Sequence, residues 1–233
     1  MKKLLMFSLL LAWAVPASAT VYTDSTGDLG GYASGFPHMD IASVEVTNTA
    51  TDVTFAVNLV GDISTATGAD WAKYIITIDS VPGGDTVGNA PDWSRNLYMP
   101  SGMDYFVGSW ADSGGGAQLY NYDGANWNGP AGVSTSLNQF SISFTMPLAD
   151  IGVSLGGSFD FDVFTTGGTA GSGGLGGDAG TDSLGNAGVA SDDWGGGSFG
   201  ATEALPVTYV TPEPATLGLL AIGGVLALRR RRS

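Results

Sequence analysis

The sequence of 233 residues contains no cysteine and a single histidine. The lack of cysteine excludes disulfide scaffolds, cysteine nucleophiles and metal sites built from thiolates. One histidine excludes metal sites built from several imidazoles and leaves few ways to assemble a Ser-His-Asp triad. The chemistry that remains available belongs to carboxylates, hydroxyls, amides and aromatic rings.

Basic residues are scarce too: 8 Lys and Arg stand against 22 Asp and Glu, for a formal net charge of -14. Two terminal clusters, Lys2–Lys3 and Arg229–Arg232, hold six of the eight, so the body of the chain keeps only Lys73 and Arg95. An acidic body repels phosphate backbones, and we expect no nucleic-acid partner. Most of the acids are Asp, whose short side chain suits turns and the coordination of hard cations.

The N-terminus has the pattern of a secretory signal peptide. Two lysines precede the apolar stretch Leu4–Val15, and Ala17-Ser18-Ala19 fits a small-x-small cleavage site. The apolar stretch falls short of the ~20 residues that span a bilayer. We therefore predict a signal helix within residues 1–19, export, and a mature chain that begins at Thr20.

The C-terminus combines three features in order: Pro212-Glu213-Pro214, the apolar run 215–228, and the basic cluster Arg229, Arg230, Arg231 and Arg232. The apolar run predicts a short hydrophobic helix of roughly 21 Å, less than the ~30 Å hydrocarbon core of a bilayer. We expect transient or permanent contact with the inner membrane, with the arginines on the cytoplasmic side.

This order of features resembles the PEP-CTERM sorting signal, over residues 211–233. The resemblance implies export in a Gram-negative bacterium, with the export machinery and an exosortase as partners, and cutting near the motif. It also implies membrane anchoring before sorting, and delivery to the cell surface or to an exopolysaccharide matrix.

The body, residues 20–210, alternates apolar and polar side chains in short runs separated by Gly-rich turns, and it contains no convincing amphipathic helix. This pattern predicts an all-β fold, an antiparallel β-sandwich of the jelly-roll or Ig-like kind. Asp123-Gly124 predicts a hairpin. The expected strands are Val53–Leu59, Phe140–Met146 and Phe159–Val163, with weaker signals at Ile41–Thr47, Tyr74–Ile78, Tyr105–Trp110, Ala117–Tyr122 and Pro206–Val210.

One stretch of the body, 167–200, is too long and too rich in Gly and Asp for an ordinary turn, which indicates a functional or a mobile loop. Four of its acids could supply a second cation site, or none: Asp178, Asp182, Asp192 and Asp193.

The body also resembles the β-sandwich domains of family 9 carbohydrate-binding modules, DOMON domains and the glucodextranase C-terminal domain. The resemblance rests on D-x-x-G-D and Gly-Tyr within Asp24–Tyr32, on the D-[IL]-x-x-[FV]-x-V strand Asp40–Val46, on the strand that ends at Ile78-Asp79, and on the turn Met146–Gly152. It implies a carbohydrate-binding or DOMON-like module.

Three acids near the start of the mature chain, Asp24, Asp28 and Asp40, are candidate metal ligands. A loop that folds back before the first long strand would bring them together, and hard oxygen ligands favour Ca²⁺ over Mg²⁺ in an irregular cage. The alternative is that these carboxylates cap turns and remain solvated.

Aromatic residues offer a second chemistry, since rings stack on sugars while amides and carboxylates bind hydroxyl groups. Trp110 and Trp127, with Tyr122 and Asn126 close to Trp127, are the candidate ligand-binding residues; the alternative is that the rings are core. His38 follows a proline in a loop and is expected at the surface.

Together these patterns predict an exported, non-catalytic surface or matrix protein that binds carbohydrate or exopolysaccharide, with calcium stabilisation. One alternative is a purely structural calcium-binding surface protein. Another is a glycoside hydrolase that uses Asp160 and Asp162, although solvated or cation-binding aspartates are the more ordinary interpretation. Haem binding is disfavoured because His38 and a few methionines are the only axial ligands on offer.

Overall fold

The structure, a computed structural model of the whole chain, describes residues 19–29, 31–66, 72–87, 95, 97–111, 114–167, 180–186 and 202–213. Within these residues it contains strands and short 3-10 turns, and no α-helix. Nothing helical in this part of the chain is long and apolar enough to span a membrane. The predicted signal helix and the predicted hydrophobic helix at 215–228 lie outside the described residues.

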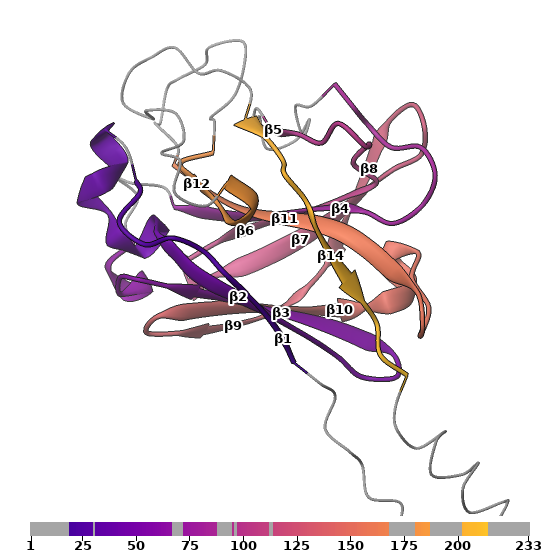
Figure 1. Cartoon of the computed structure of the whole chain (residues 1–233), viewed down its shortest axis with the longest axis horizontal. Helices are drawn as coiled ribbons and strands as arrows, with labels where there is room; N and C mark the ends of the chain where they lie inside the picture. The colour runs from indigo at the N-terminus through magenta and orange to yellow at the C-terminus, as the bar shows by residue number, and fades with distance from the viewer. Residues whose placement is uncertain are drawn as a thin grey trace, which may run out of the picture.

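Two sheets of antiparallel strands form two layers (Figure 1). The first sheet has the order β1-β2-β3-β10-β9, with β1 (Thr20–Thr23), β2 (Ile41–Asn48), β3 (Asp52–Leu59), β10 (Ser141–Pro147) and β9 (Ser134–Asn138). The second has the order β12-β11-β4-β6-β7-β8, with β14 also paired to β11: β12 (Asp182–Ser183), β11 (Ser158–Thr166), β4 (Lys73–Asp79), β6 (Tyr105–Trp110), β7 (Gly116–Tyr122), β8 (Trp127–Gly132) and β14 (Val207–Val210).

A minor parallel pair joins β5 (Leu97–Tyr98) to β13 (Thr202–Glu203). The short 3-10 turns are η1 (Gly31–Gly35), η2 (Pro37–Met39), η3 (Ile63–Thr65), η5 (Leu148–Ile151) and η6 (Leu184–Asn186). The predicted antiparallel all-β architecture is therefore confirmed, with this one parallel pair as the exception.

Alternation in the sequence locates the long strands well. Each of the eight expected strands is present, and Tyr105–Trp110 has the predicted bounds. The predicted hairpin at Asp123-Gly124 joins β7 to β8, where the Asp123 N–H donates to the Asn126 carbonyl at 3.0 Å. Phe140 is the exception within β10: it was expected on the buried face but lies in the turn before the strand, 48% exposed.

The main core fills the space between the two sheets. Val44 and Phe55 of the first sheet and Ile76 and Phe161 of the second belong to one cluster of fully buried side chains. Phe161 lies at its centre, with its ring centroid 5.2 Å from those of both Tyr22 and Phe55. Edge-on ring contacts of this kind add to the free energy gained by burying apolar area.

A second, smaller core covers the outer face of the second sheet. Ile75 and Phe106 on that face pack with Leu97, Met99 and Met103 from the segment between β4 and β6. Because β4 is covered on both faces, its residues from Lys73 to Ile78 are all buried, and Thr77 is the single polar residue between Tyr74 and Ile78.

The strand β2 carries the chain from one end of the domain to the other. Asp40 precedes it and Asn48 ends it, and eight strand residues span about 27 Å. Thr20 pairs with Val46 near the end of β2, and Asn48 Nδ2 donates to the Pro212 carbonyl at 3.5 Å. The beginning of β1 and the end of β14 therefore lie at one end of the domain, opposite the start of β2 (Figure 1).

The core predicts a clear contrast between two phenylalanines. Replacing the buried Phe161 with Ala leaves a cavity beside the rings of Tyr22 and Phe55 and should lower the free energy of unfolding by about 3–5 kcal/mol. The same replacement at the half-exposed Phe140 should cost less than about 1 kcal/mol. Urea denaturation of both variants measures the difference, and equal losses would contradict this assignment of the core.

Candidate functional site

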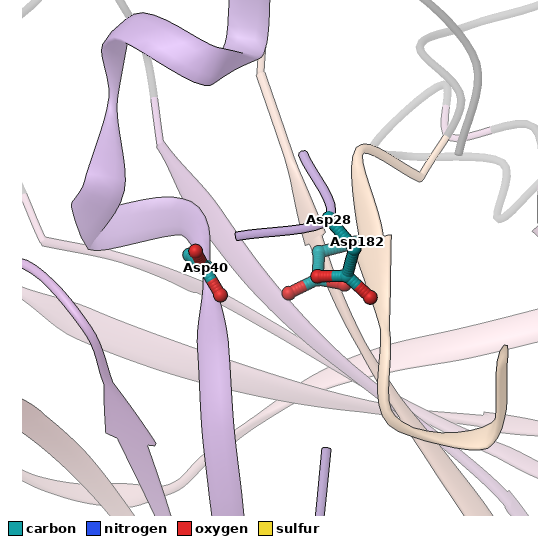
Figure 2. Close-up of side chains that lie close together, drawn as sticks. All are labelled: Asp28, Asp40 and Asp182. Carbon is teal, nitrogen blue, oxygen red and sulfur yellow. The ribbon is translucent and has the colours of Figure 1, made fainter. Parts of the chain in front are cut away.

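Three carboxyl groups converge at the end of the domain opposite the beginning of β1 and the end of β14. Asp28, Asp40 and Asp182 each offer an oxygen atom, and these atoms lie within 4.8 Å of one another (Figure 2). Asp28 comes from the loop after β1, Asp40 from the start of β2 and Asp182 from β12. We call this group the aspartate cluster.

Backbone geometry holds two of these acids in place. Asp40 ends the turn η2, where its N–H donates to the Pro37 carbonyl at 3.3 Å. Asp182 pairs with Thr165 of β11, and its Oδ2 accepts a hydrogen bond of 2.6 Å from the Ile41 N–H. The acid of β12 is thereby bonded to the first residue of β2.

Two of the three carboxyl groups are buried, Asp28 is half-buried, and the hydrogen bonding of the cluster is incomplete. Asp40 is 4% exposed and Asp182 is 2% exposed. Asp40 Oδ2 accepts from the Gly27 N–H at 2.8 Å, but the buried Oδ1 of Asp40 has no hydrogen-bond partner. The neighbouring Asp24 has a buried Oδ2 in the same condition. Buried polar atoms normally have partners, so these two oxygens are candidate points of contact for a ligand.

Burial and like charge raise the pKa values at this site. The pKa of Asp182 rises to about 8, first through burial and then through the charges of Asp24 and Asp28. The pKa of Asp24 rises to about 7, chiefly through burial, with repulsion from its acidic neighbours. Burial also raises the pKa of Asp40. Once these carboxyl groups release their protons, the all-oxygen set can bind a hard divalent cation, and Ca²⁺ tolerates such an irregular arrangement best.

The structure places the three predicted metal ligands unequally. It brings Asp28 and Asp40 together, whereas Asp24 lies beside the cluster, where it acts on Asp182 through its charge. Asp182 was expected at most in a second cation site, yet it lies together with Asp28 and Asp40. Its sequence separation of 141 residues from Ile41 leaves no local signal of this contact. Asp178, Asp192 and Asp193 lie outside the described residues.

Asp162 is a buried acid of a different kind. It is 0% exposed, and its carboxylate accepts hydrogen bonds from the N–H groups of Gly185 and Leu205 and from Ser183 Oγ, each at 3.0 Å. Burial raises the pKa of Asp162 to about 6. The expectation of a solvated carboxylate is therefore wrong for this residue: Asp162 fastens segments 183–185 and 205 to β11. Asp160, on the same face, accepts from Thr208 Oγ1 at 2.6 Å.

The predicted sugar-binding aromatics do not share a groove. Trp127 and Tyr122 lie side by side, with ring centroids 5.4 Å apart. The Trp127 ring also packs edge-on against Phe106, and its Nε1 donates to Asp85 Oδ2 at 3.0 Å. Both the ring and the N–H of Trp127 are thus engaged within the protein.

Trp110 lies at the opposite end of the antiparallel pair formed by β6 and β7, away from Tyr122. It is opposite Gly116 in the register of β6 and β7, and a Cβ added to Gly116 would come within 2.2 Å of the indole ring. Asn126 belongs to the β7–β8 turn, where its N–H donates to Asp123 Oδ1 at 2.8 Å. The four candidate residues therefore fall at two separate places.

His38 was expected at the surface and is in fact buried, at 2% exposed. It belongs to η2, and its Nδ1 lies 3.2 Å from Thr65 Oγ1. The Tyr74 hydroxyl donates to the His38 carbonyl at 3.0 Å. The cause of the difference is that η2 folds against β3 and the core instead of projecting as a loop.

A polar hollow of about 420 Å³ opens beside the edge strand β8. Asn121 and Asn128 face each other across β7 and β8, and the register of the two strands shifts just before Asn121. The remaining lining mixes an aromatic ring, aliphatic groups and a carboxylate: Tyr105, Leu119, Gly129, Pro130, Ala131 and Asp150. Bulges of this kind re-aim side chains at strand edges.

The start of the sorting motif lies against the domain. Thr211 is fully buried; its N–H donates to the Gly157 carbonyl at 2.9 Å and its Oγ1 to the Ser154 carbonyl at 2.9 Å. The Pro212 carbonyl accepts the 3.5 Å contact from Asn48. We call residues 211–213 the terminal strap. Pro214 and the four terminal arginines lie outside the described residues.

The two acids of β11 predict a matched contrast. Asp162→Ala leaves several buried N–H and O–H donors without an acceptor and should lower the free energy of unfolding by at least ~3 kcal/mol. Asp160→Ala removes one exposed hydrogen bond and should cost less than about 1 kcal/mol. Chemical denaturation distinguishes them, and a mild effect at Asp162 would refute its structural role.

The pKa values predict how stability depends on pH in metal-free protein. Asp182 and Asp24 have pKa values of about 8 and about 7 when folded, against an ordinary aspartate value of 3.8, so between these limits the folded state binds more protons than the unfolded state. The free energy of unfolding should therefore fall as pH rises from about 4 to about 8. Urea titrations in chelator, with Asp182→Asn as the variant that flattens the curve, measure this; a flat wild-type curve would contradict it.

Comparison with known proteins identifies the C-terminal segment. Residues 210–232 match the family model described as the PEP-CTERM protein-sorting motif. No curated protein matches the chain. The prediction from Pro212-Glu213-Pro214, the apolar run and the arginines is thereby confirmed, while the resemblance of the body to carbohydrate-binding modules stays a prediction. The chain carries a PEP-CTERM sorting motif that begins at the last residue of its two-sheet domain, which marks it as an exported protein that an exosortase sorts.

Proposed function

We propose that this chain is a non-catalytic protein of the cell surface or extracellular matrix of a Gram-negative bacterium, stabilised by Ca²⁺. Its two sheets pack as an antiparallel β-sandwich of the jelly-roll or Ig-like kind. The sorting motif supports delivery across the inner membrane and anchoring before release. The aspartate cluster supports the calcium, and the polar hollow supports a carbohydrate ligand.

The observation that carries the calcium proposal is the Oδ1 atom of Asp40. This oxygen is buried without a hydrogen-bond partner, in a side chain that is 4% exposed and beside two further carboxyl groups. An uncompensated carboxylate in such a place is costly, and a bound cation offsets that cost. Ca²⁺ takes 6–8 oxygens, so backbone carbonyls and water complete the set.

A catalytic role for the acids has less support. Glycoside hydrolysis by two carboxylates requires both to face one sugar-binding cleft. Asp162 is wholly buried and is used as a hydrogen-bond acceptor, and Asp160 is bonded to Thr208. We therefore propose binding and not hydrolysis.

The calcium proposal predicts a shift in thermal stability. Saturating Ca²⁺ should raise the midpoint of thermal unfolding by about 5–10 °C over protein in chelator. Asp40→Asn should abolish most of that rise, because it removes a ligand charge from the cluster. Asp52→Asn, at the opposite end of the domain in the β2–β3 hairpin, should leave it intact. An equal midpoint with and without Ca²⁺ in the wild type would refute the proposal.

Carbohydrate binding is favoured by one specific observation, the Asn121 side chain. Asn121 is exposed within the hollow beside β8, and its amide makes no hydrogen bond within the described part of the chain. The adjacent Asn128 uses its Nδ2 to bond Asp123 and offers its carbonyl oxygen. Donors and acceptors around a tyrosine ring suit a sugar with several hydroxyl groups. A chain of net charge -14 favours neutral over anionic glycans.

A larger hollow of about 540 Å³ is a weaker candidate. Its polar groups are already bonded to one another, since Ser64 Oγ and Gln139 Nε2 both donate to the Asp62 carboxylate, at 2.6 Å and 3.0 Å. A ligand there would have to displace those bonds before it gained any.

The glycan proposal predicts retardation of the protein in gels that contain a neutral glucan. Asn121→Ala should weaken that binding by about tenfold, the effect of losing one or two hydrogen bonds. Asn126→Ala, in the neighbouring turn, serves as the control and should bind as the wild type does. Gels that contain a polyuronate should retard neither protein. Wild-type protein that migrates freely in every neutral glucan would leave only the structural, calcium-binding alternative.

A further inference from the structure

The sorting motif begins inside the folded domain, with no linker before it. The family match starts at Val210, which is the last residue of β14 and pairs with Ser158 of β11. Thr211 continues the pairing: its N–H donates to the Gly157 carbonyl at 2.9 Å, and its carbonyl accepts from the Gly156 N–H at 3.0 Å. The first residues of the matched sorting motif are therefore also part of the edge of the second sheet.

Side chains hold the terminal strap as well. The Thr211 hydroxyl is shared between two carbonyl acceptors, Ser154 at 2.9 Å and Gly157 at 3.0 Å. The Thr211 side chain is 0% exposed. Asn48 contacts the Pro212 carbonyl through Nδ2, and its Oδ1 accepts from the buried Tyr209 hydroxyl at 2.7 Å.

The final described residue lies over a glycine. A Cβ built on Gly156 would lie 3.5 Å from Glu213 Oε1, so the acid of the motif rests on the turn before β11. Pro212 is half-buried and Glu213 is exposed, which leaves one side of the motif's start covered by the domain.

We propose that the terminal strap masks the start of the sorting motif, and that the exosortase engages the motif only after residues 211–213 detach from the domain. This inference rests on exosortase sorting and adds a controlling step to it. An enzyme that reads a peptide segment needs access to its backbone, and cleavage of protected segments follows the population of the open form.

Detachment of the strap is a local event. It breaks the hydrogen bonds of Thr211 and the contact to Pro212, while Tyr209 and the core between the sheets stay packed. Local openings at chain ends need much less free energy than global unfolding. Three freed residues also add up to about 10 Å of reach between the domain and the apolar run that begins at Ala215.

The test measures the rate of processing of the full chain in a host that contains an exosortase, by pulse-chase. Thr211→Val keeps the shape and the backbone bonds but removes both side-chain hydrogen bonds, and it should raise the rate by about tenfold. Thr208→Val, whose hydroxyl bonds the half-exposed Asp160, is the matched control and should be processed at the wild-type rate.

A second variant keeps the test independent of folding defects. An eight-residue Gly/Ser insertion between Thr211 and Pro212 frees the motif without touching the sheet, and it should be processed at least as fast as Thr211→Val. In Thr211→Val, the backbone amide of residue 211 should exchange its hydrogen faster than in the wild type, whereas the amides of β4 should keep their protection.

Two outcomes would overturn the proposal in different ways. Wild-type rates for both Thr211→Val and the insertion would refute the mask while leaving exosortase sorting intact. Wild-type protein that is never processed in such a host would contradict exosortase sorting itself, and the mask with it.

Discussion

The mutual repulsion of buried aspartates is the constraint that organises the end of the domain opposite its termini. Asp28, Asp40 and Asp182 meet where the N-terminal loop, β2 and β12 join, and Asp24 adds its charge from beside them. The same groups link distant parts of the chain, since Asp182 bonds the first N–H of β2. A cation bound at this point would offset the repulsion between the carboxylates. It would also link the segments that carry them, which come from the first and last thirds of the chain.

Two buried acids on neighbouring segments illustrate two ways to satisfy a carboxylate. Asp162 is surrounded by N–H and O–H donors from β12, η6 and the segment before β14, so it needs no metal. Asp40 receives one such donor and keeps a bare oxygen. The difference between their surroundings distinguishes a structural carboxylate from a candidate ligand more sharply than burial alone does, because both are buried.

Prediction from the sequence works where one strand face is buried and fails where the contact is remote. Alternation locates β3 and β10 because every second side chain enters the core. It misses β8 and β9, which are mostly exposed edge strands and show no alternation. Asp28 and Asp40 were predictable from their short separation, whereas Asp182 arrives through sheet topology. The partner of Trp127, Asp85, lies 42 residues away and carries no local signal either.

The two proposed roles of the domain, sorting and calcium binding, belong to its two opposite ends. The end that carries the terminal strap connects to the sorting machinery, and the opposite end carries the aspartate cluster, about one strand length away. The proposed calcium binding and the proposed masking of the sorting motif therefore depend on different contacts.

A crystal structure of the protein grown in Ca²⁺ tests the central claim most directly. The account predicts one ion in contact with Asp28, Asp40 and Asp182, with oxygen ligands at about 2.3–2.6 Å and with Asp40 Oδ1 among them. A site that holds only water at saturating Ca²⁺, with the three carboxyl groups unchanged, would contradict it.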